Sequence, residues 1–238
     1  MIMFETVNEL TLKVTCRGND TIFTKAGAFI AGESSVRNYR FEKVLLGPEQ
    51  NVGSALLGSI VRRVTGENIP LMKVTFSGDA VTYYANCGQH VVVYQLEQGE
   101  MISVESENLL AFSSACKYSV RFIGVGIFSQ KGLCTTTLTA MGRDAFVAVI
   151  CDGNPIVLSN YNTGGTLVAD PDAVVCWIGN GNCDPGIKAD VNWKTFIGQS
   201  SGESYMFEWD RGNPVTVIIQ PSERGGNYGR ANIRLGID

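Results

Sequence analysis

The sequence is poor in the residue type that most metal sites and many enzymes need. A single histidine, His90, occurs in 238 residues, so a site built from several imidazole ligands is excluded. A Ser/His/Asp or Cys/His arrangement would depend on His90 alone, which precedes an expected strand in "CGQHVVVY". We interpret His90 as an exposed residue at the start of a strand. We expect no catalytic residue, no metal site and no cofactor.

Long hydrophobic runs are also lacking. No stretch approaches the roughly 18 apolar residues that a membrane helix needs, and the N-terminal "MIMFETVNELTLKV" has no basic region before an apolar run. The formal net charge of −4 works against a general attraction to nucleic acid or to an anionic membrane. We expect a soluble, cytoplasmic protein without a secretory signal, with no membrane partner and no broad affinity for nucleic acid.

A disulfide framework is not indicated either. The seven cysteines are odd in number and widely spread, and most lie among apolar neighbours, as in "VVCWI" and "VAVICDG". This pattern is typical of buried free thiols. With 45% hydrophobic and 18% charged residues, the composition is that of a folded globular chain.

The sequence is rich in β-strand signals. Runs such as "LTLKVTC", "HVVVYQLEQGEMISVE" and "FVAVICDGNPIVLSN" are dense in Val, Ile, Thr and Phe and are cut by Gly, Asn and Asp. Alternation of apolar and polar residues, as in 118–122, indicates antiparallel strands with one face in a core and the other in water. Gly78 and the Asp152-Gly153-Asn154 turn predict hairpins between their flanking strands.

One pattern recurs along the chain. Residues 96–112, "LEQGEMISVESENLLAF", correspond at an offset of 65 to residues 161–177, "YNTGGTLVADPDAVVCW". The matched pairs include Leu109/Val174, Leu110/Val175, Ala111/Cys176 and Phe112/Trp177. A fainter copy at an offset of 80 matches Ile22/Ile102, Phe29/Leu109, Ile30/Leu110 and Ala31/Ala111. We predict one compact β domain over 1–238 made of three internal units, approximately 1–80, 81–145 and 146–238.

One segment departs from the β pattern. Residues 51–67, "NVGSALLGSIVRRVTGE", have apolar residues at helical spacing but also two glycines, so a short helix and a β-hairpin tip are both open. We favour the helix. Its Leu56, Ile60, Arg62 and Arg63 form a candidate partner surface, although a lid over one end of the core explains the same residues.

Several acidic positions are candidate ligands or catalysts. Asp170 and Asp172, and the "GNGNCD" turn with Asn180, Asn182 and Asp184, could offer oxygen atoms to calcium, but Asp and Asn also favour tight turns for backbone reasons. Glu105 and Glu107 lie two positions apart, which on a strand places both on one face. We interpret all of them as solvated surface or turn residues.

The C-terminal part carries two further signals. "SERGGNYGR", with Arg224, Tyr228 and Arg230, weakly resembles RNA-binding RGG segments. The aromatic residues in the C-terminal third are expected in the core, or alternatively at the interface of a homo-oligomer: Trp177, Trp193, Phe196, Tyr205, Phe207 and Trp209.

Four stretches in order carry a family resemblance: "GAFIAGE", "QLEQGEMISVESENLLAF", "GIFSQKGLCTTTLTAMGRDAFVAVICDGNPIVL" and "VIIQPSE". The chain resembles, over nearly its whole length, the bacterial members of the altered inheritance of mitochondria 24 family. The resemblance implies a TRAP-like β-sandwich, similar to the tryptophan RNA-binding attenuation protein and repeated in tandem. It implies no catalytic residues. The segment "EQNVGSALLGSIVRRVTGENIPLM" looks longer than the matching connection in typical members.

The predicted fold is therefore an all-β, antiparallel β-sandwich built from tandem TRAP-like repeats, with at most one or two short helices. Our functional hypothesis is a non-enzymatic interaction or scaffold module that self-associates and has an unidentified protein partner, because the edges of small β units need cover. One alternative is a small-ligand binding protein or enzyme with a site in a cleft between β units. A second alternative is RNA binding by analogy with the TRAP fold.

Overall fold

The computed structural model describes residues 1–34, 36–44, 70–122, 134–162, 164–181, 183–189 and 205–221. Within these ranges the chain is almost entirely β, with one three-residue 3-10 helix, η1 (Ser106–Asn108), and every strand pairing is antiparallel. The predicted all-β, antiparallel sandwich architecture is confirmed. The described part has no helix long and apolar enough to cross a membrane. The segment 51–67, including the candidate surface Leu56, Ile60, Arg62 and Arg63, lies outside the described residues.

The first two sheets contain strands from the N-terminal two thirds of the chain. Sheet A has the order β1 (Ile2–Thr6), β2 (Leu12–Cys16), β7 (Ala80–Tyr84) and β4 (Phe29–Glu33). Sheet B has the order β5 (Tyr39–Val44), β6 (Leu71–Ser77), β3 (Asn19–Lys25), β10 (Leu109–Ser113), β13 (Phe146–Cys151) and β8 (His90–Gln95).

The other two sheets lie toward the C-terminus. Sheet C has the order β11 (Cys116–Phe122), β12 (Cys134–Ala140), β9 (Glu100–Val104), β16 (Val174–Asn180), β19 (Val215–Ile219) and β14 (Ile156–Ser159). Sheet D has the order β15 (Leu167–Ala169), β18 (Tyr205–Trp209) and β17 (Gly186–Ala189).

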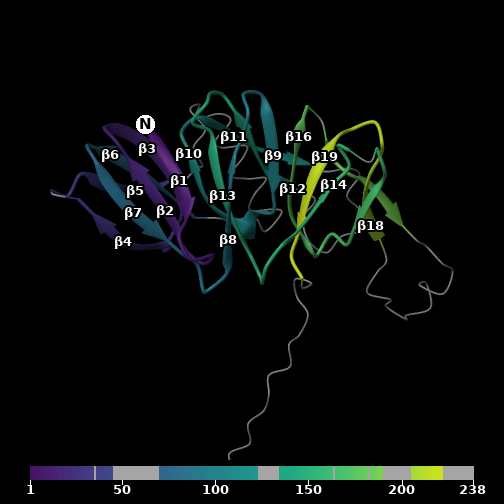
Figure 1. Ribbon diagram of the computed structural model, residues 1–238, viewed down its shortest axis with the longest axis horizontal. Helices are drawn as coiled ribbons and strands as arrows, with labels where there is room; N and C mark the ends of the chain where they lie inside the picture. Colours follow the sequence, from purple (N-terminus) through teal and green to yellow (C-terminus); the bar gives the residue numbers. More distant parts are fainter. Residues whose placement is uncertain are drawn as a thin grey trace, which may run out of the picture.

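The four sheets stack as layers that enclose three separate cores. One core, with Leu12, Phe76 and Ile150, lies between sheets A and B, and a second, with Leu109, Phe112 and Ile178, lies between sheets B and C. The third, with Val174, Trp177 and Trp209, lies between sheets C and D. Figure 1 shows the layers side by side, from purple at the N-terminal end to yellow near the C-terminal end.

The central strands differ from the alternating pattern that the sequence suggested. Every residue of β10 and β13, and all but the last residue of β16, is buried. These strands lie in sheets B and C, which have a core on both faces, so the side chains on both faces are mostly apolar. Strand β2, in the outer sheet A, keeps the alternation, because one of its faces has no described layer over it.

The two predicted hairpins are wrong. Gly78 and Asp79 join β6 in sheet B to β7 in sheet A, and the turn at Asp152-Gly153-Asn154 joins β13 in sheet B to β14 in sheet C. Gly153 has a positive φ of 78°, as expected for a tight turn. Such residues are favoured in any tight turn, whether or not its flanking strands pair, so turn chemistry alone did not reveal that the chain changes layer here.

The same irregularity occurs in three strands. The pairing register shifts between Phe29 and Ala31 in β4, between Leu109 and Ala111 in β10, and between Val174 and Cys176 in β16. These shifts, typical of β-bulges, lie at the offsets of 80 and 65 found in the sequence. Leu109 faces the core between sheets B and C, and Val174 faces the next core along the stack.

Candidate functional site

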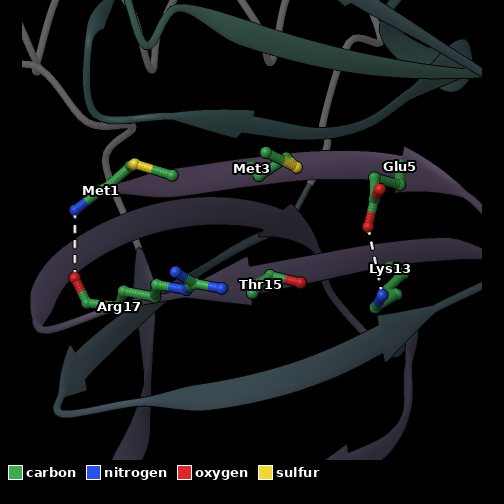
Figure 2. A pocket seen from close by; sticks show the side chains of 6 residues that line it. All are labelled: Met1, Met3, Glu5, Lys13, Thr15 and Arg17. Carbon is green, nitrogen blue, oxygen red and sulfur yellow. Dashed lines mark hydrogen bonds and ion pairs between the residues drawn. The ribbon is translucent and has the colours of Figure 1, made fainter.

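The exposed outer face of sheet A contains a shallow groove in the part of the chain that the structure describes. The groove has a volume of about 300 Å³ and is lined by Met1, Met3, Glu5, Lys13, Thr15 and Arg17. These side chains project from one face of β1 and β2 because the strands pair in register, with Met3 opposite Thr15 and Glu5 opposite Lys13. Figure 2 shows the six side chains in two facing rows. The face is partly apolar: Met1 is 60% exposed and Met3 39%.

Three of the charged groups in the groove, Lys13, Glu5 and the N-terminal ammonium, have partners. Lys13 Nζ lies 3.2 Å from Glu5 Oε2, and the N-terminal ammonium donates a hydrogen bond of 3.1 Å to the carbonyl oxygen of Arg17. The ammonium also lies 3.8 Å from Asp20 Oδ2. These are solvent-exposed interactions between oppositely charged or dipolar groups, of the kind common on protein surfaces. The groove holds no side chain arranged as a nucleophile with its base, so its geometry favours contact with another surface over chemistry.

The far side of this face ends at the edge strand β4. All five of its residues are exposed, with Ile30 at 55%, and β7 is its one strand partner in the described sheet. Tyr83 Oη donates a hydrogen bond of 2.6 Å to Glu33 Oε1, and this bond raises the pKa of Tyr83. Gly32 leaves room for the Tyr39 ring, because a Cβ at this position would overlap its hydroxyl.

The opposite end of the stack also ends in an open strand. Strand β15 is the edge of sheet D and pairs with β18 in the described structure. Its central residue, Val168, is 46% exposed, whereas Ala169 faces the core shared with sheet C. In the described structure, the two outer sheets of the stack therefore each have an edge strand of this kind: β4 in sheet A and β15 in sheet D.

A half-buried ion pair lies at the junction of sheets C and D. Arg121 Nη2 in β11 lies 2.6 Å from Asp184 Oδ2, and Arg121 Nη1 lies 3.2 Å from the Met101 sulfur. Burial raises the pKa of the Asp184 carboxyl, and the Arg121 guanidinium opposes that shift. Burial likewise raises the pKa of the neighbouring Cys183 thiol to about 11, which keeps it protonated. This arrangement ties the segment before β17 to sheet C.

The predicted acidic candidates form no metal-binding cluster in the described ranges. In the described ranges no group of three or more His, Cys, Asp and Glu residues could hold a metal ion. Asp170 Oδ1 accepts a hydrogen bond of 2.8 Å from the Asp172 backbone N–H, as turn chemistry requires. Asn180 is the last residue of β16, and Asp184 pairs with Arg121. Asn182 lies outside the described residues.

The interpretation of Glu105 and Glu107 as neighbours on a strand is wrong. Glu105 is the N-cap residue of η1, and Glu107 lies inside this 3-10 helix. The strand β9 ends at Val104, so spacing by two no longer places both carboxylates on one face. The carbonyl oxygen of Glu107 accepts a hydrogen bond of 2.9 Å from Lys25 Nζ.

The other predicted positions have mixed outcomes. His90 begins β8 and is half-buried, opposite Cys151 in β13. Cys87 is exposed in the preceding turn, whereas five further cysteines are buried and form no disulfide among the described residues: Cys16, Cys116, Cys151, Cys176 and Cys183. Trp177, Phe207 and Trp209 pack together in the core between sheets C and D.

Several of the C-terminal candidate residues lie outside the described part of the chain. Trp193, Phe196, Arg224, Tyr228 and Arg230 lie outside the described residues, as does the side chain of Tyr205. Sequence reasoning missed the outer face of sheet A and the two open edges. The alternation in β1 and β2 was a usable signal for an outward row, but it does not reveal which strands end a sheet.

Comparison with known proteins gives a family and a fold. The family model described as Mitochondrial biogenesis AIM24 matches residues 4–222. A crystal structure of protein SPYM3_0169 from Streptococcus pyogenes is similar, with a TM-score of 0.67, 17% sequence identity, and 94% of each chain covered. At this identity the similarity shows the fold alone. No curated protein matches the chain.

Proposed function

The chain belongs to the Mitochondrial biogenesis AIM24 family, and from its open sheet edges we propose that it is a non-enzymatic scaffold that self-associates head to tail. In the proposed assembly, edge β4 of one copy pairs with edge β15 of the next copy. The observation that carries the proposal is that two equivalent junctions already exist inside the chain. Strand β10 pairs with β3 in sheet B, and β16 pairs with β9 in sheet C.

The strand order supports a division into three units. The order β4-β7-β2 in sheet A corresponds to β10-β13-β8 in sheet B and to β16-β19-β14 in sheet C. The order β3-β6-β5 in sheet B corresponds to β9-β12-β11 in sheet C and to β15-β18-β17 in sheet D. Each central sheet thus joins half of one proposed unit to half of the next. Sheets A and D are the half-sheets left over at the two ends.

The two junctions inside the chain predict the register of the proposed junction between β4 of one copy and β15 of the next. Ala111 lies opposite Thr24 in sheet B, and Cys176 lies opposite Val104 in sheet C. Applying the offsets of 80 and 65 places Ala31 of one copy opposite Ala169 of its neighbour. By the same shift, Glu33 falls opposite Leu167. The pairing is antiparallel, as in every described sheet of the chain.

The exposed outer face of sheet A fits the same assembly. Ile30 corresponds in sequence to Leu110 and Val175, which are fully buried against the preceding sheet. Ile30 is 55% exposed because sheet A has no described layer before it. Joining sheet A to sheet D of another copy would bring this face over that copy, and the partly apolar groove along β1 and β2 would become part of the contact.

Sedimentation velocity tests the assembly. The unmodified protein is expected to sediment as a multimer at micromolar concentration. Val168→Pro, which removes a backbone donor from edge β15, and Ile30→Lys, which charges the outer face, are each expected to give a monomer with unchanged circular dichroism. Met141→Lys is the matched control, because Met141 is 61% exposed and lies in a turn outside both edges. A strict monomer for the unmodified protein contradicts the proposal.

Cysteine cross-linking tests the register in a Cys87→Ser background. Glu33→Cys and Leu167→Cys variants, mixed and oxidised, are expected to form a covalent dimer that neither variant forms alone. Lys188→Cys replaces Leu167→Cys as the control, because β17 lies at the other edge of sheet D. Equal cross-linking by the control would contradict the pairing of β4 with β15.

The two alternatives have separate assays. A ligand-binding role would use the groove on β1 and β2, and a metabolite screen by thermal shift would detect it as a stabilisation of the fold. RNA binding would give filter retention that decreases steeply with salt. The groove lies on strands at one end of the stack and not between the proposed units, so it does not favour the predicted cleft site.

A further inference from the structure

Strand β14 forms an open and uncharged edge of sheet C. Ile156 is 50% exposed and Val157 57% exposed, and β19 is the one strand that pairs with β14 in the described structure. No other described backbone group bonds to the four residues of β14. Among the described residues, the outer side of the strand thus has no backbone partner and lies beside exposed apolar side chains, the combination that favours addition of another strand.

Most other edge strands of the chain carry charges that discourage such pairing. Glu5 lies in β1, Glu33 in β4, Arg40 in β5 and Lys188 in β17, and β11 carries Lys117 and Arg121. The sequence of β14, Ile-Val-Leu-Ser, contains no charge. Two other described edge strands, β8 and β15, also lack Asp, Glu, Lys and Arg, and β8 is contacted at Val91 by the segment that follows β1.

The two strands that correspond to β14, β2 and β8, are each contacted by an extended segment of the chain. Strand β2 is covered by β1, which pairs with it from Ile2 to Thr6. Strand β8 is contacted by the segment that follows β1: the Val91 N–H donates a hydrogen bond of 2.7 Å to the Glu9 carbonyl oxygen, and Thr6 Oγ1 donates one of 3.4 Å to the Val91 carbonyl oxygen. No described segment has this position beside β14.

We propose that β14 binds an extended segment of a partner protein, which adds to sheet C as an antiparallel strand. Val157 lies opposite Ile218, which faces the core shared with sheet B. Ile156 lies opposite Ile219, which packs against the core shared with sheet D. The apolar side chains of β14 thus lie on both faces of the sheet. The bound segment has consecutive apolar residues and has no proline where a backbone donor is needed.

The dimensions of this edge favour a flexible partner segment over a second copy of the chain. Four residues of strand span about 13 Å. Two folded copies that met along this edge alone, without an additional face contact like the one proposed for sheet A, would bury less than the roughly 1,000 Å² that a stable interface needs. A flexible segment can pair with β14 and continue over the adjoining surface, where Tyr161 is 47% exposed. The inference does not depend on the head-to-tail assembly, because β14 is separate from β4 and β15.

Fluorescence anisotropy with a labelled synthetic peptide tests the site. The peptide has a central Val-Ile-Val-Leu stretch between Thr residues and terminal Lys residues. We expect saturable binding to the unmodified protein, at least about tenfold weaker binding to Val157→Lys, and unchanged binding to Met141→Lys. A peptide N-methylated along the edge that would face β14 is expected not to bind, since it lacks the backbone donors.

Several results would overturn the site. Absence of saturable binding to the unmodified protein would do so, as would equal binding of the N-methylated peptide, which identifies a non-specific apolar contact. Equal binding to Val157→Lys would place the peptide elsewhere, and the comparison of the two peptides keeps the test valid if this variant fails to fold. A decrease in sedimenting mass caused by Val157→Lys would assign the edge to a second copy. Loss of the multimer in Val168→Pro, with peptide binding retained, separates the two proposals.

Discussion

The central sheets B and C and the outer sheets A and D are made of similar strands, yet they differ in how much of each strand is covered. Phe112, in sheet B, is fully buried, with Phe23 and Tyr118 stacked against it at ring-centroid distances of 5.0 and 5.7 Å. Phe29, in sheet A, is 37% exposed although it also contacts aromatic rings. The difference indicates that strands of sheets B and C bury side chains on both faces, while exposed apolar side chains of sheet A lie at an end of the stack.

The largest expected effect comes from a deletion in the central core. Phe112→Ala is expected to lower the free energy of unfolding by about 3–5 kcal/mol, because it removes a fully buried ring between two sheets. Phe29→Ala, which truncates a partly exposed ring of outer sheet A, is expected to cost about 1–2 kcal/mol. Urea unfolding measures both. Equal losses would contradict the distinction between central and outer sheets.

A smaller effect is expected at the junction of sheets C and D. Arg121→Gln should lower the free energy of unfolding by about 1–2 kcal/mol at neutral pH, because it leaves the half-buried Asp184 carboxylate without its cation. Burial raises the pKa of Asp184 in the folded state, so the cost of ionising this group is present above that pKa and disappears as the pH falls below the pKa of the unfolded chain. The variant's loss of stability is therefore expected to decrease from pH 7 toward pH 4.

Thermal unfolding at several pH values measures this dependence. Arg40→Gln is the matched control, because Arg40 is also paired with a carboxylate, Glu42, but its side chain is 76% exposed. The control is expected to change stability by less than about 0.5 kcal/mol at either pH. A loss for Arg121→Gln that is independent of pH would assign its effect to packing alone.

The smallest effect on stability is expected at the exposed thiol. Cys87→Ser should leave the free energy of unfolding nearly unchanged and remove one rapidly reacting thiol from the folded protein. Cys116, in the central core, is buried, and its pKa is raised to about 11, so it should react only on unfolding. A chromogenic disulfide reagent at pH 8 measures both phases. Rapid reaction of Cys116 in the folded state would contradict the tight central packing.

Local sequence information was enough to predict an all-β, antiparallel fold, because strand-forming residues and the turns between them are recognised from short stretches of sequence. Leu109 and Val174, which the sequence pattern pairs at an offset of 65, each lie directly before a register shift in their strands. Strand partners were not predictable in the same way. The turns at Gly78 and Gly153 have ordinary turn residues, and only contacts distant in sequence determine that their flanking strands join different sheets.

The candidate surfaces were harder to predict for a related reason. Met3 and Glu5 are two positions apart in β1, and Lys13 and Thr15 are two positions apart in β2, so the residues of each pair share a face of their strand. Their exposure depends on whether another layer covers that face. The apolar run in β14 resembles that in β13, yet β13 is central in its sheet and β14 is an edge. The partner surface at Leu56, Ile60, Arg62 and Arg63 stays a prediction.

The pairing of β3 with β10 and of β9 with β16 means that each central sheet is completed by strands distant in the sequence. Cleavage of the backbone at the turn of Asn86 to Gln89 would leave two fragments still linked by the hydrogen bonds between β3 and β10. We therefore expect a protease cut at this turn to leave a single particle in solution, which separates into two pieces only in denaturant. The same interleaving delays completion of either sheet until much of the polypeptide has been synthesised.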